Sequence, residues 1–157
     1  MKKTLISLAM AMTTTLLMGQ MTPQEAAKIE AENPLVKEWN TPFQTPPFNS
    51  IKTEHYKPAM LYAIEQAKQE VNAIIVNRAR PDFENTIVAL ERAGGLLNRI
   101  SGVFFNLNEC MTSDQLQQIY MEIIPDLTAY GNDVSMNPLL FAKVKEVYDQ
   151  RDDIALT

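Results

Sequence analysis

The stretch KPAMLYAIEQAKQEVNAIIV, residues 57–76, decides the fold of this chain. Its apolar residues recur at alternating steps of four and three, which is the spacing of one face of an α-helix. They are Met60, Ile64, Ala67, Val71 and Ile74. The pattern predicts an amphipathic helix from about Thr53 to Asn77, with Pro58 in or near its first turn. Such a helix needs other helices against its apolar face.

The next helical stretch runs from about Asp82 or Asn85 to Asn108. One seam contains Ile87, Leu90, Gly94, Leu97, Ser101, Phe104 and Asn108, with Ile100 and Leu107 beside it. The pair Gly94-Gly95 disfavours a helix interior, because each glycine costs about 1 kcal/mol relative to alanine. Either the helix bends there or a neighbouring backbone approaches closely. The close approach of a neighbouring backbone is favoured, because the apolar stripe keeps its helical spacing on both sides of Gly94-Gly95.

Two more helices are predicted towards the C-terminus. Residues 112–115, Thr-Ser-Asp-Gln, offer a capping box. The helix after them is expected to kink at Pro125 and to end at Gly131-Asn132-Asp133. Asn137-Pro138 then reads as the cap and first position of a last helix. The inward side chains are predicted to be Leu116, Ile119, Tyr120, Ile123, Leu127 and Tyr130 in the first helix, and Leu140, Phe141, Val144, Val147 and Tyr148 in the second.

The N-terminal side contains a short helix and then a proline-rich segment. A capping box at residues 22–25 starts the helix, and Asn33-Pro34 ends it. Residues 39–48 hold three prolines, which exclude a helix. We expect an extended segment that wraps around the helical body and inserts its aromatic side chains into it, namely Trp39, Phe43 and Phe48. The alternative is a proline-rich ligand for a groove-binding domain.

No stretch shows the period-two alternation of a half-buried strand, so the predicted fold class is all-α. The helices are expected to be antiparallel and joined by short loops. The hydrophobic content of 46% and charged content of 21% are ordinary for a globular domain. The net charge of −5 argues against a nucleic-acid binder.

The first residues have the pattern of a secretory leader. A basic start, Met1-Lys2-Lys3, precedes an uncharged apolar run over residues 5–18. Residues 1–19 are therefore predicted to be a signal peptide cut after Gly19, with residues 20–157 exported, as to a periplasm. A membrane anchor needs about 20 apolar residues and is disfavoured. An amphipathic first helix is the other alternative.

His55 and Cys110 are the only histidine and cysteine. A two-histidine zinc helix would need a second histidine four residues away from His55, where the chain has Ile51 and Ala59. We therefore interpret His55 as a helix-start residue bonded to backbone or water. Cys110 lies beside Glu109, whose carboxylate disfavours the nucleophilic thiolate, so we predict a buried structural thiol.

Other candidate groups do not complete a known motif. The Gly94-Gly95 pair lacks the spacing of a phosphate loop, and the acidic pairs Asp82/Glu84 and Asp152-Asp153 lack that of a calcium loop. The residues themselves thus indicate no catalytic group, no metal ligand and no defined substrate-binding residue.

Four ordered blocks stand out between residues 33 and 154. They are Asn33-Pro34 with Trp39–Phe43 and Pro46-Pro47-Phe48; Ile51 with Glu54-His55-Tyr56 and Pro58-Ala59; Pro81–Glu91; and Asn137–Phe141 with Val144, Val147-Tyr148 and Arg151. Together they resemble the N-terminal region of bacterial peptidyl-dipeptidases, or dipeptidyl carboxypeptidases. These enzymes belong to the thimet-oligopeptidase-like family of zinc metallopeptidases.

The resemblance implies an enzyme much longer than 157 residues. In that family a His-Glu-x-x-His helix and a later glutamate bind one zinc ion, and no position here matches them. The chain would then be an N-terminal fragment that binds no zinc and is inactive alone. It would form part of the helical wall of a channel for oligopeptide substrates, with the C-terminal catalytic part as its partner. The alternative is a freestanding, non-enzymatic helical domain that binds peptides or proteins.

Overall fold

The computed structural model describes residues 21–152, and within this range the chain forms helices and no β-strand. The predicted all-α fold class is confirmed. The predicted signal peptide, residues 1–19, lies outside the described residues. Residues 21–152 also contain no helix with the length and apolar character needed to cross a membrane.

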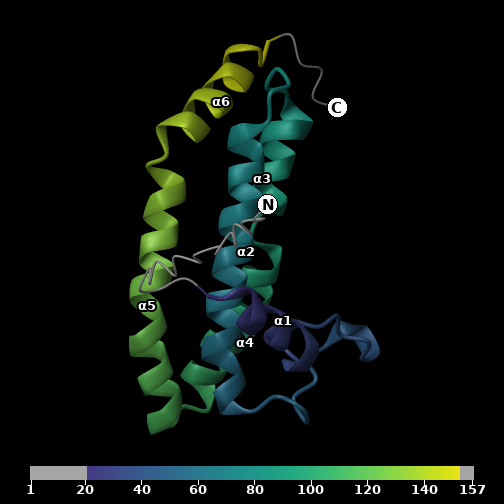
Figure 1. Ribbon diagram of the computed structural model, residues 1–157, viewed down its shortest axis with the longest axis vertical. Coiled ribbons are helices and arrows are strands. Elements are labelled where there is room, and N and C mark those ends of the chain that lie inside the picture. The colour runs from purple at the N-terminus through teal and green to yellow at the C-terminus, as the bar shows by residue number, and fades with distance from the viewer. Residues whose placement is uncertain (1–20, 153–157) are drawn as a thin grey trace, which may run out of the picture.

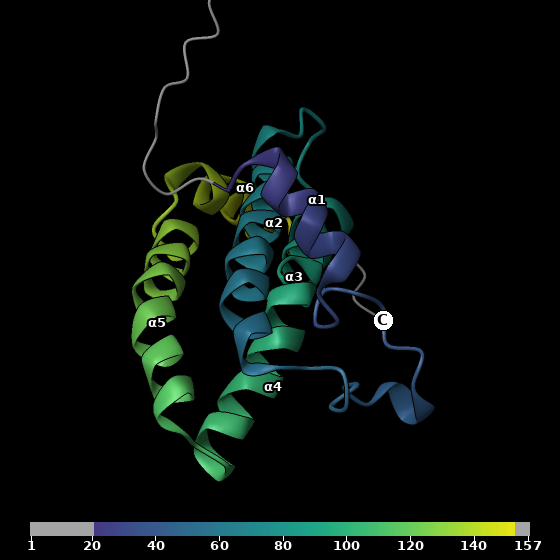
Figure 2. The ribbon, with the colours of Figure 1, turned by 60° about the horizontal axis from the view of Figure 1, so that its bottom comes forward.

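Helix α2, Tyr56–Val76, is the central element of the fold. A 3₁₀ turn, η2 (Thr53–His55), precedes it, and its predicted apolar stripe is buried along its whole length. Helix α4 (Gly95–Cys110) runs antiparallel to α2, and α5 (Asp114–Ser135) returns along its other side. Figures 1 and 2 show these three long helices side by side. The predicted antiparallel arrangement is therefore correct.

Two hydrophobic clusters lie along α2. The larger one joins its N-terminal half to α4, α5 and the segment after α1, and it includes the fully buried Met60, Ile100, Phe104, Ile123 and Leu35. The smaller one joins the C-terminal half of α2 to the tip of the molecule, through Val71, Ile74 and Leu140. Helix α2 is the element that contributes buried residues to both clusters.

The tip is built from three short elements. They are a π-helical turn η3 (Phe83–Val88), helix α3 (Ala89–Arg92) and helix α6 (Pro138–Asp149). Asp82 caps η3 by accepting a hydrogen bond from the Asn85 backbone N at 2.7 Å. Asn137 caps α6 by accepting from the backbone N of Leu139 and Leu140, both at 3.0 Å, as predicted for Asn137-Pro138.

The predicted long helix from about Asp82 or Asn85 to Asn108 is wrong, because the chain breaks between Arg92 and Gly95. Gly94 has φ +76°, a left-handed conformation that glycine adopts without the cost paid by other residues. The apolar pattern did not reveal the break, because it continues after Gly95, where Leu97 and Phe104 are buried. The favoured alternative, close approach of a neighbouring backbone, is also wrong: the atoms nearest to a Cβ on Gly94 belong to side chains, Tyr130 Oη at 3.4 Å and Ala67 Cβ at 3.7 Å.

The two glycines therefore predict opposite responses to alanine. Gly94→Ala is expected to lower the free energy of unfolding by about 1–2 kcal/mol, because an L-residue is strained at positive φ. Gly95→Ala is the matched control, since an added Cβ meets nothing within 4 Å, and we expect it to stabilise by about 0.4–1 kcal/mol. Urea unfolding followed by circular dichroism measures both. Equal effects of the two variants would contradict the assignment of the break to Gly94.

Three further predictions about α5 and α6 need correction. Ser113, not Thr112, caps α5 by accepting from the Leu116 backbone N, and no capping box forms. Helix α5 passes through Gly131-Asn132-Asp133 and ends at Ser135. Phe141 and Tyr148 are 66% and 62% exposed, although they were predicted to point inward with the buried Leu140 and Val147. A helical pattern shows which residues share a face, but burial needs a neighbouring element on that face.

Helix α1, Pro23–Glu32, begins and ends as predicted. Thr22 and Glu25 form the capping box: Glu25 Oε2 accepts from the Thr22 backbone N at 2.8 Å, and Thr22 Oγ1 accepts from the Glu25 backbone N at 3.2 Å. Asn33 ends the helix, and its side chain accepts from the Leu35 backbone N at 3.0 Å.

The proline-rich segment is only partly packed on the body. Trp39 is buried as predicted and donates from Nε1 to the Pro34 carbonyl at 3.1 Å. Phe43 is 100% exposed and Phe48 is 54% exposed, so the prediction that they insert into the helical body is wrong. Phe43 lies in a short turn, η1 (Pro42–Gln44), where Phe43 and Gln44 have φ values of 59° and 54°. Left-handed backbone costs a non-glycine residue about 1–2 kcal/mol.

Candidate functional site

A cleft of about 630 Å³ lies between α1, α2 and α5. This volume falls within the range of ligand sites, which is about 300–1,000 Å³. Apolar groups of all three helices, and one from the segment that precedes α1, line it, namely Met21, Ile29, Pro58, Leu61, Ile64 and Ala129. Charged groups also line it, namely Glu25, Lys28, Glu32, Glu65, Lys68 and Asp126. Figure 1 shows α1 in front of the lower part of α2, with α5 to the left.

Two part-buried hydrogen bonds hold α1 against α2. The hydroxyl of Tyr62 donates to Glu30 Oε1 at 2.6 Å, and Asn33 Nδ2 donates to the His55 carbonyl at 2.9 Å. Burial, together with the bond to the Glu30 carboxylate, raises the pKa of Tyr62 to about 12. Tyr62 and Asn33 are each 5% exposed, whereas the acceptor Glu30 is exposed. The α1 wall of the cleft is thus fixed at two points.

Helix α5 is held by apolar packing and by one ion pair. Ile123 is fully buried in the larger cluster, and Leu116 is nearly so. Lys57 Nζ lies 2.7 Å from Glu122 Oε2, which links the start of α2 to α5. The hydrogen bond from Lys57 lowers the pKa of Glu122, with Gln118 contributing a second bond. The pair is more than a third exposed, so it orients the helix more than it stabilises it.

The charges around the cleft are unequal. Four carboxylates line it against two ammonium groups. Glu25 is ionised, because the bonds from the backbone and hydroxyl of Thr22 lower its pKa. Apolar groups with carboxylates among them suit a peptide that carries an apolar side chain and a positive charge. The lining residues of the cleft, as described, include no Ser, Thr or Cys side chain.

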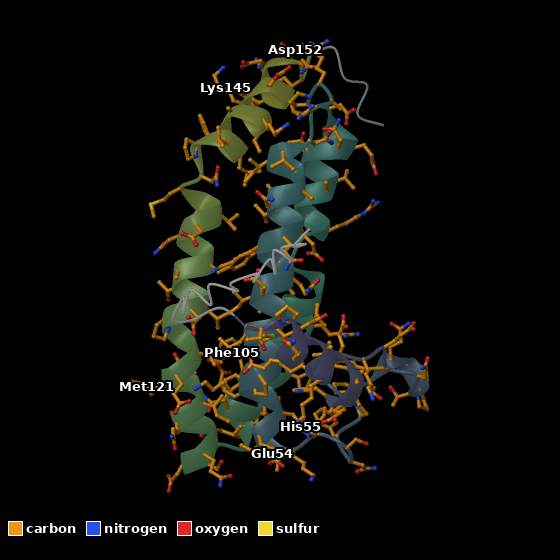
Figure 3. All side chains as sticks on the ribbon, in the orientation of Figure 1. Glu54, His55, Phe105, Met121, Lys145 and Asp152 are labelled. Carbon is orange, nitrogen blue, oxygen red and sulfur yellow. The ribbon has the colours of Figure 1, made fainter. Side chains whose placement is uncertain are left out.

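His55 lies at the start of α2 and lines two hollows. Its Nδ1 accepts from the Lys52 backbone N at 3.1 Å, which confirms the prediction of a helix-start histidine bonded to backbone. It borders the cleft and also a second hollow of about 350 Å³ beneath the proline-rich loop. Figure 3 shows His55 and Glu54 near the lower end of the helices.

The other candidate residues are dispersed. Cys110 is exposed, so the prediction of a buried thiol is wrong; it sits at the last turn of α4, where no element covers it. Asp82 caps η3, and Glu84 pairs with Arg92 at 3.4 Å. Asp152 pairs with Arg151 at 3.6 Å, and Asp153 lies outside the described residues.

These side chains do not fit a zinc ion. Across residues 21–152, no three His, Cys, Asp or Glu side chains come close enough together to hold a metal. His55 lies at the start of α2 and Cys110 at the end of α4, and neither belongs to a group of three such side chains among the described residues.

Sequence reasoning did not find the cleft. The spacing of Glu65 and Lys68 along α2 indicates an exposed face, but it does not show which helix lies opposite. The three helices that meet here are separated by long stretches of sequence. The charge pattern on α1, with Glu25, Lys28 and Glu32 on successive turns, is the one signal that marked a polar face.

Comparison with known proteins shows that this helical chain is similar to one region of known peptidases. It is 40% identical to the dipeptidyl carboxypeptidase of Salmonella typhimurium and 37% identical to that of Escherichia coli, each over 124 residues. It is 30% identical over 117 residues to oligopeptidase A of Salmonella typhimurium. The first two matches cover 79% of this chain and the third covers 74%. The resemblance to dipeptidyl carboxypeptidases is confirmed.

The matches cover little of the relatives. The chain spans 18% of the length of each dipeptidyl carboxypeptidase and 17% of oligopeptidase A. No protein-family model matches the chain. The chain is therefore homologous to one region of these peptidases.

Proposed function

We propose that residues 20–157 are a helical region of an exported zinc peptidase that hydrolyses oligopeptides and releases dipeptides from their C-termini. The similarity to dipeptidyl carboxypeptidases over 79% of the chain is the observation that carries this proposal. In it, the chain forms part of the wall of the substrate channel, and the cleft between α1, α2 and α5 contacts the peptide. The apolar lining and the excess of carboxylates support peptide binding.

The export of this region rests on the basic start and the apolar run over residues 5–18. The zinc site and the catalytic base belong, in this proposal, to the rest of the peptidase. Neither His55 nor Cys110 takes part in them. The one role assigned to this chain is to hold the substrate channel in shape and to contact the peptide.

The isolated 157-residue chain is expected to show no peptidase activity and no stoichiometric zinc. The physical reason is that one histidine and dispersed carboxylates cannot provide the ligands of a catalytic zinc site. Hydrolysis of a blocked tripeptide, with and without added zinc, and elemental analysis measure the two quantities. Zinc-dependent hydrolysis by the purified chain would overturn the prediction.

A chimera provides the positive arm of the same test. In the dipeptidyl carboxypeptidase of Salmonella typhimurium, the segment that aligns with this chain is replaced by this chain's residues. The chimera is expected to retain at least about a tenth of the parental kcat/KM, a loss below about 1.4 kcal/mol in transition-state stabilisation. A folded chimera with no dipeptide release would contradict the proposed role.

The second candidate function is a freestanding helical domain that binds peptides or proteins. The cleft and the exposed Phe141 and Tyr148 favour it. The coding sequence downstream of Thr157 separates the two candidates. An open frame that encodes His-Glu-x-x-His supports the peptidase, and a stop codon supports the freestanding domain.

A further inference from the structure

The loop between Trp39 and η2 presents two aromatic side chains to solvent. Phe43 is 100% exposed and Phe48 is 54% exposed, whereas Trp39 at the base of the loop is buried. Figures 1 and 2 both show the blue segment that contains η1 standing away from the helices. The loop is thus anchored at its base, and its tip offers apolar surface that the described chain does not cover.

The conformation of the tip is held from within. The Thr41 hydroxyl donates to the Thr45 carbonyl, and the Thr45 hydroxyl donates to the Pro42 carbonyl at 3.1 Å. Three prolines in the loop fix φ at their own positions, namely Pro42, Pro46 and Pro47. Phe43 and Gln44 nevertheless adopt the left-handed region, and Phe43 gains no burial among residues 21–152 for this strain. The tip is therefore preorganised to present Phe43 outwards.

The loop also carries no charge. No Asp, Glu, Lys or Arg occurs from Trp39 to Ile51, in a chain that is 21% charged. A rigid aromatic group in neutral surroundings is typical of the centre of a protein interface, where charged residues are depleted. The surface that receives it should be an uncharged apolar pocket, because a charge buried there would have no partner in the loop.

We infer that Phe43 and Phe48 dock into an uncharged apolar pocket in the part of the peptidase that has no counterpart in this chain. This inference rests on the proposed function. The matched region is 18% of each dipeptidyl carboxypeptidase, so most of the chain of such an enzyme lies elsewhere and can supply the pocket. Any 124-residue stretch of a 157-residue chain contains Phe43, so the loop belongs to the shared region. The loop joins the helical region to the rest of the enzyme.

The chimera with the Salmonella typhimurium enzyme tests the inference through the accessibility of position 43. Phe43→Cys is introduced together with Cys110→Ser, because Cys110 is exposed and would react. Mass spectrometry of the peptide that contains position 43 measures the rate of its modification by a maleimide, in the isolated chain and in the chimera. Glu54→Cys is the matched control, since the Glu54 side chain is 70% exposed and charged.

We expect position 43 to react at least about tenfold more slowly in the chimera than in the isolated chain, because burial blocks the reagent except during opening. The Glu54→Cys control should react at the same rate in both. Equal rates at position 43 in an active chimera overturn the docking and leave the proposed function intact. Protection at position 43 in an inactive chimera supports docking and counts against the proposed function. Protection already present in the isolated chain would show a second copy as the occupant and overturn the inference.

A second arrangement applies if the chimera does not fold. The photoreactive residue p-benzoylphenylalanine replaces Phe43 in the isolated chain, which is mixed with the Salmonella typhimurium enzyme lacking its aligned segment. A crosslink from position 43 to that enzyme supports the inference. Crosslinks only between copies of this chain, or none, overturn it.

Discussion

Phe104→Ala is expected to lower the free energy of unfolding by about 3–5 kcal/mol, the usual cost of removing a buried phenylalanine. Phe104 is 0% exposed and lies at the centre of the larger cluster. Its ring centroid is 5.2 Å from that of Tyr56 and 5.4 Å from that of Phe105. The rings therefore stack in tilted and edge-on arrangements, whose favourable energy is lost together with the buried area.

Urea unfolding of the isolated chain measures this loss. If the free energy of unfolding depends on urea concentration with the same slope in both proteins, the shift in the urea midpoint reports the change in stability. Phe43→Ala is the matched control, because the same side chain is removed from a fully exposed position. We expect the control to change stability by no more than about 0.5 kcal/mol. A loss below about 1 kcal/mol for Phe104→Ala would contradict the packing described for α2 and α4.

Arg99→Met is expected to lower the free energy of unfolding by about 2–3 kcal/mol, because it removes charge-assisted hydrogen bonds and a cation–π contact together. Arg99 Nη2 lies within hydrogen-bond distance of three successive carbonyls, those of Leu35, Val36 and Lys37, at 3.4, 3.2 and 3.1 Å. The guanidinium also lies 4.6 Å from the centroid of the Trp39 ring. Methionine keeps most of the apolar stem and leaves the three carbonyls without this donor.

Trp39 provides a direct measurement, since it is the one tryptophan of the chain and is 9% exposed. Its emission should shift to longer wavelength in Arg99→Met as the turn between α1 and the loop loosens. Arg92→Met is the control, because Arg92 is exposed and its pair with Glu84 is a surface ion pair. We expect Arg92→Met to lower the free energy of unfolding by less than about 1 kcal/mol. Unchanged emission and stability in Arg99→Met would show that Arg99 does not hold this turn.

The sequence predicts local structure well where one physical signal suffices. The stripe from Met60 to Ile74 places α2 and its buried face. Thr22 and Asn137 place the starts of α1 and α6, because each supplies an acceptor for backbone N–H groups that the helix leaves unpaired. These signals are contained within a few residues and need no knowledge of the rest of the fold.

The errors occur where the outcome depends on a distant element. Phe141 and Tyr148 share a helical pattern with core residues, but no described element covers them. Phe43 was expected to be buried because it is large and apolar, and the structure instead holds it away from the body. The cleft depends on three helices meeting, so neither its position nor its charge balance is present in any single stretch of sequence.

The continuity of α2 through both clusters has a consequence for how the molecule opens. The tip contains few buried residues and is joined to the body through α2, the break at Gly94 and the turn before α6. Native proteins open in cooperative units, and the units with the fewest buried contacts open most often. The tip can therefore unfold as a unit while the lower three-helix body stays folded. The N-terminal half of α2 packs in the larger cluster of the body, so its backbone should stay protected when the tip opens.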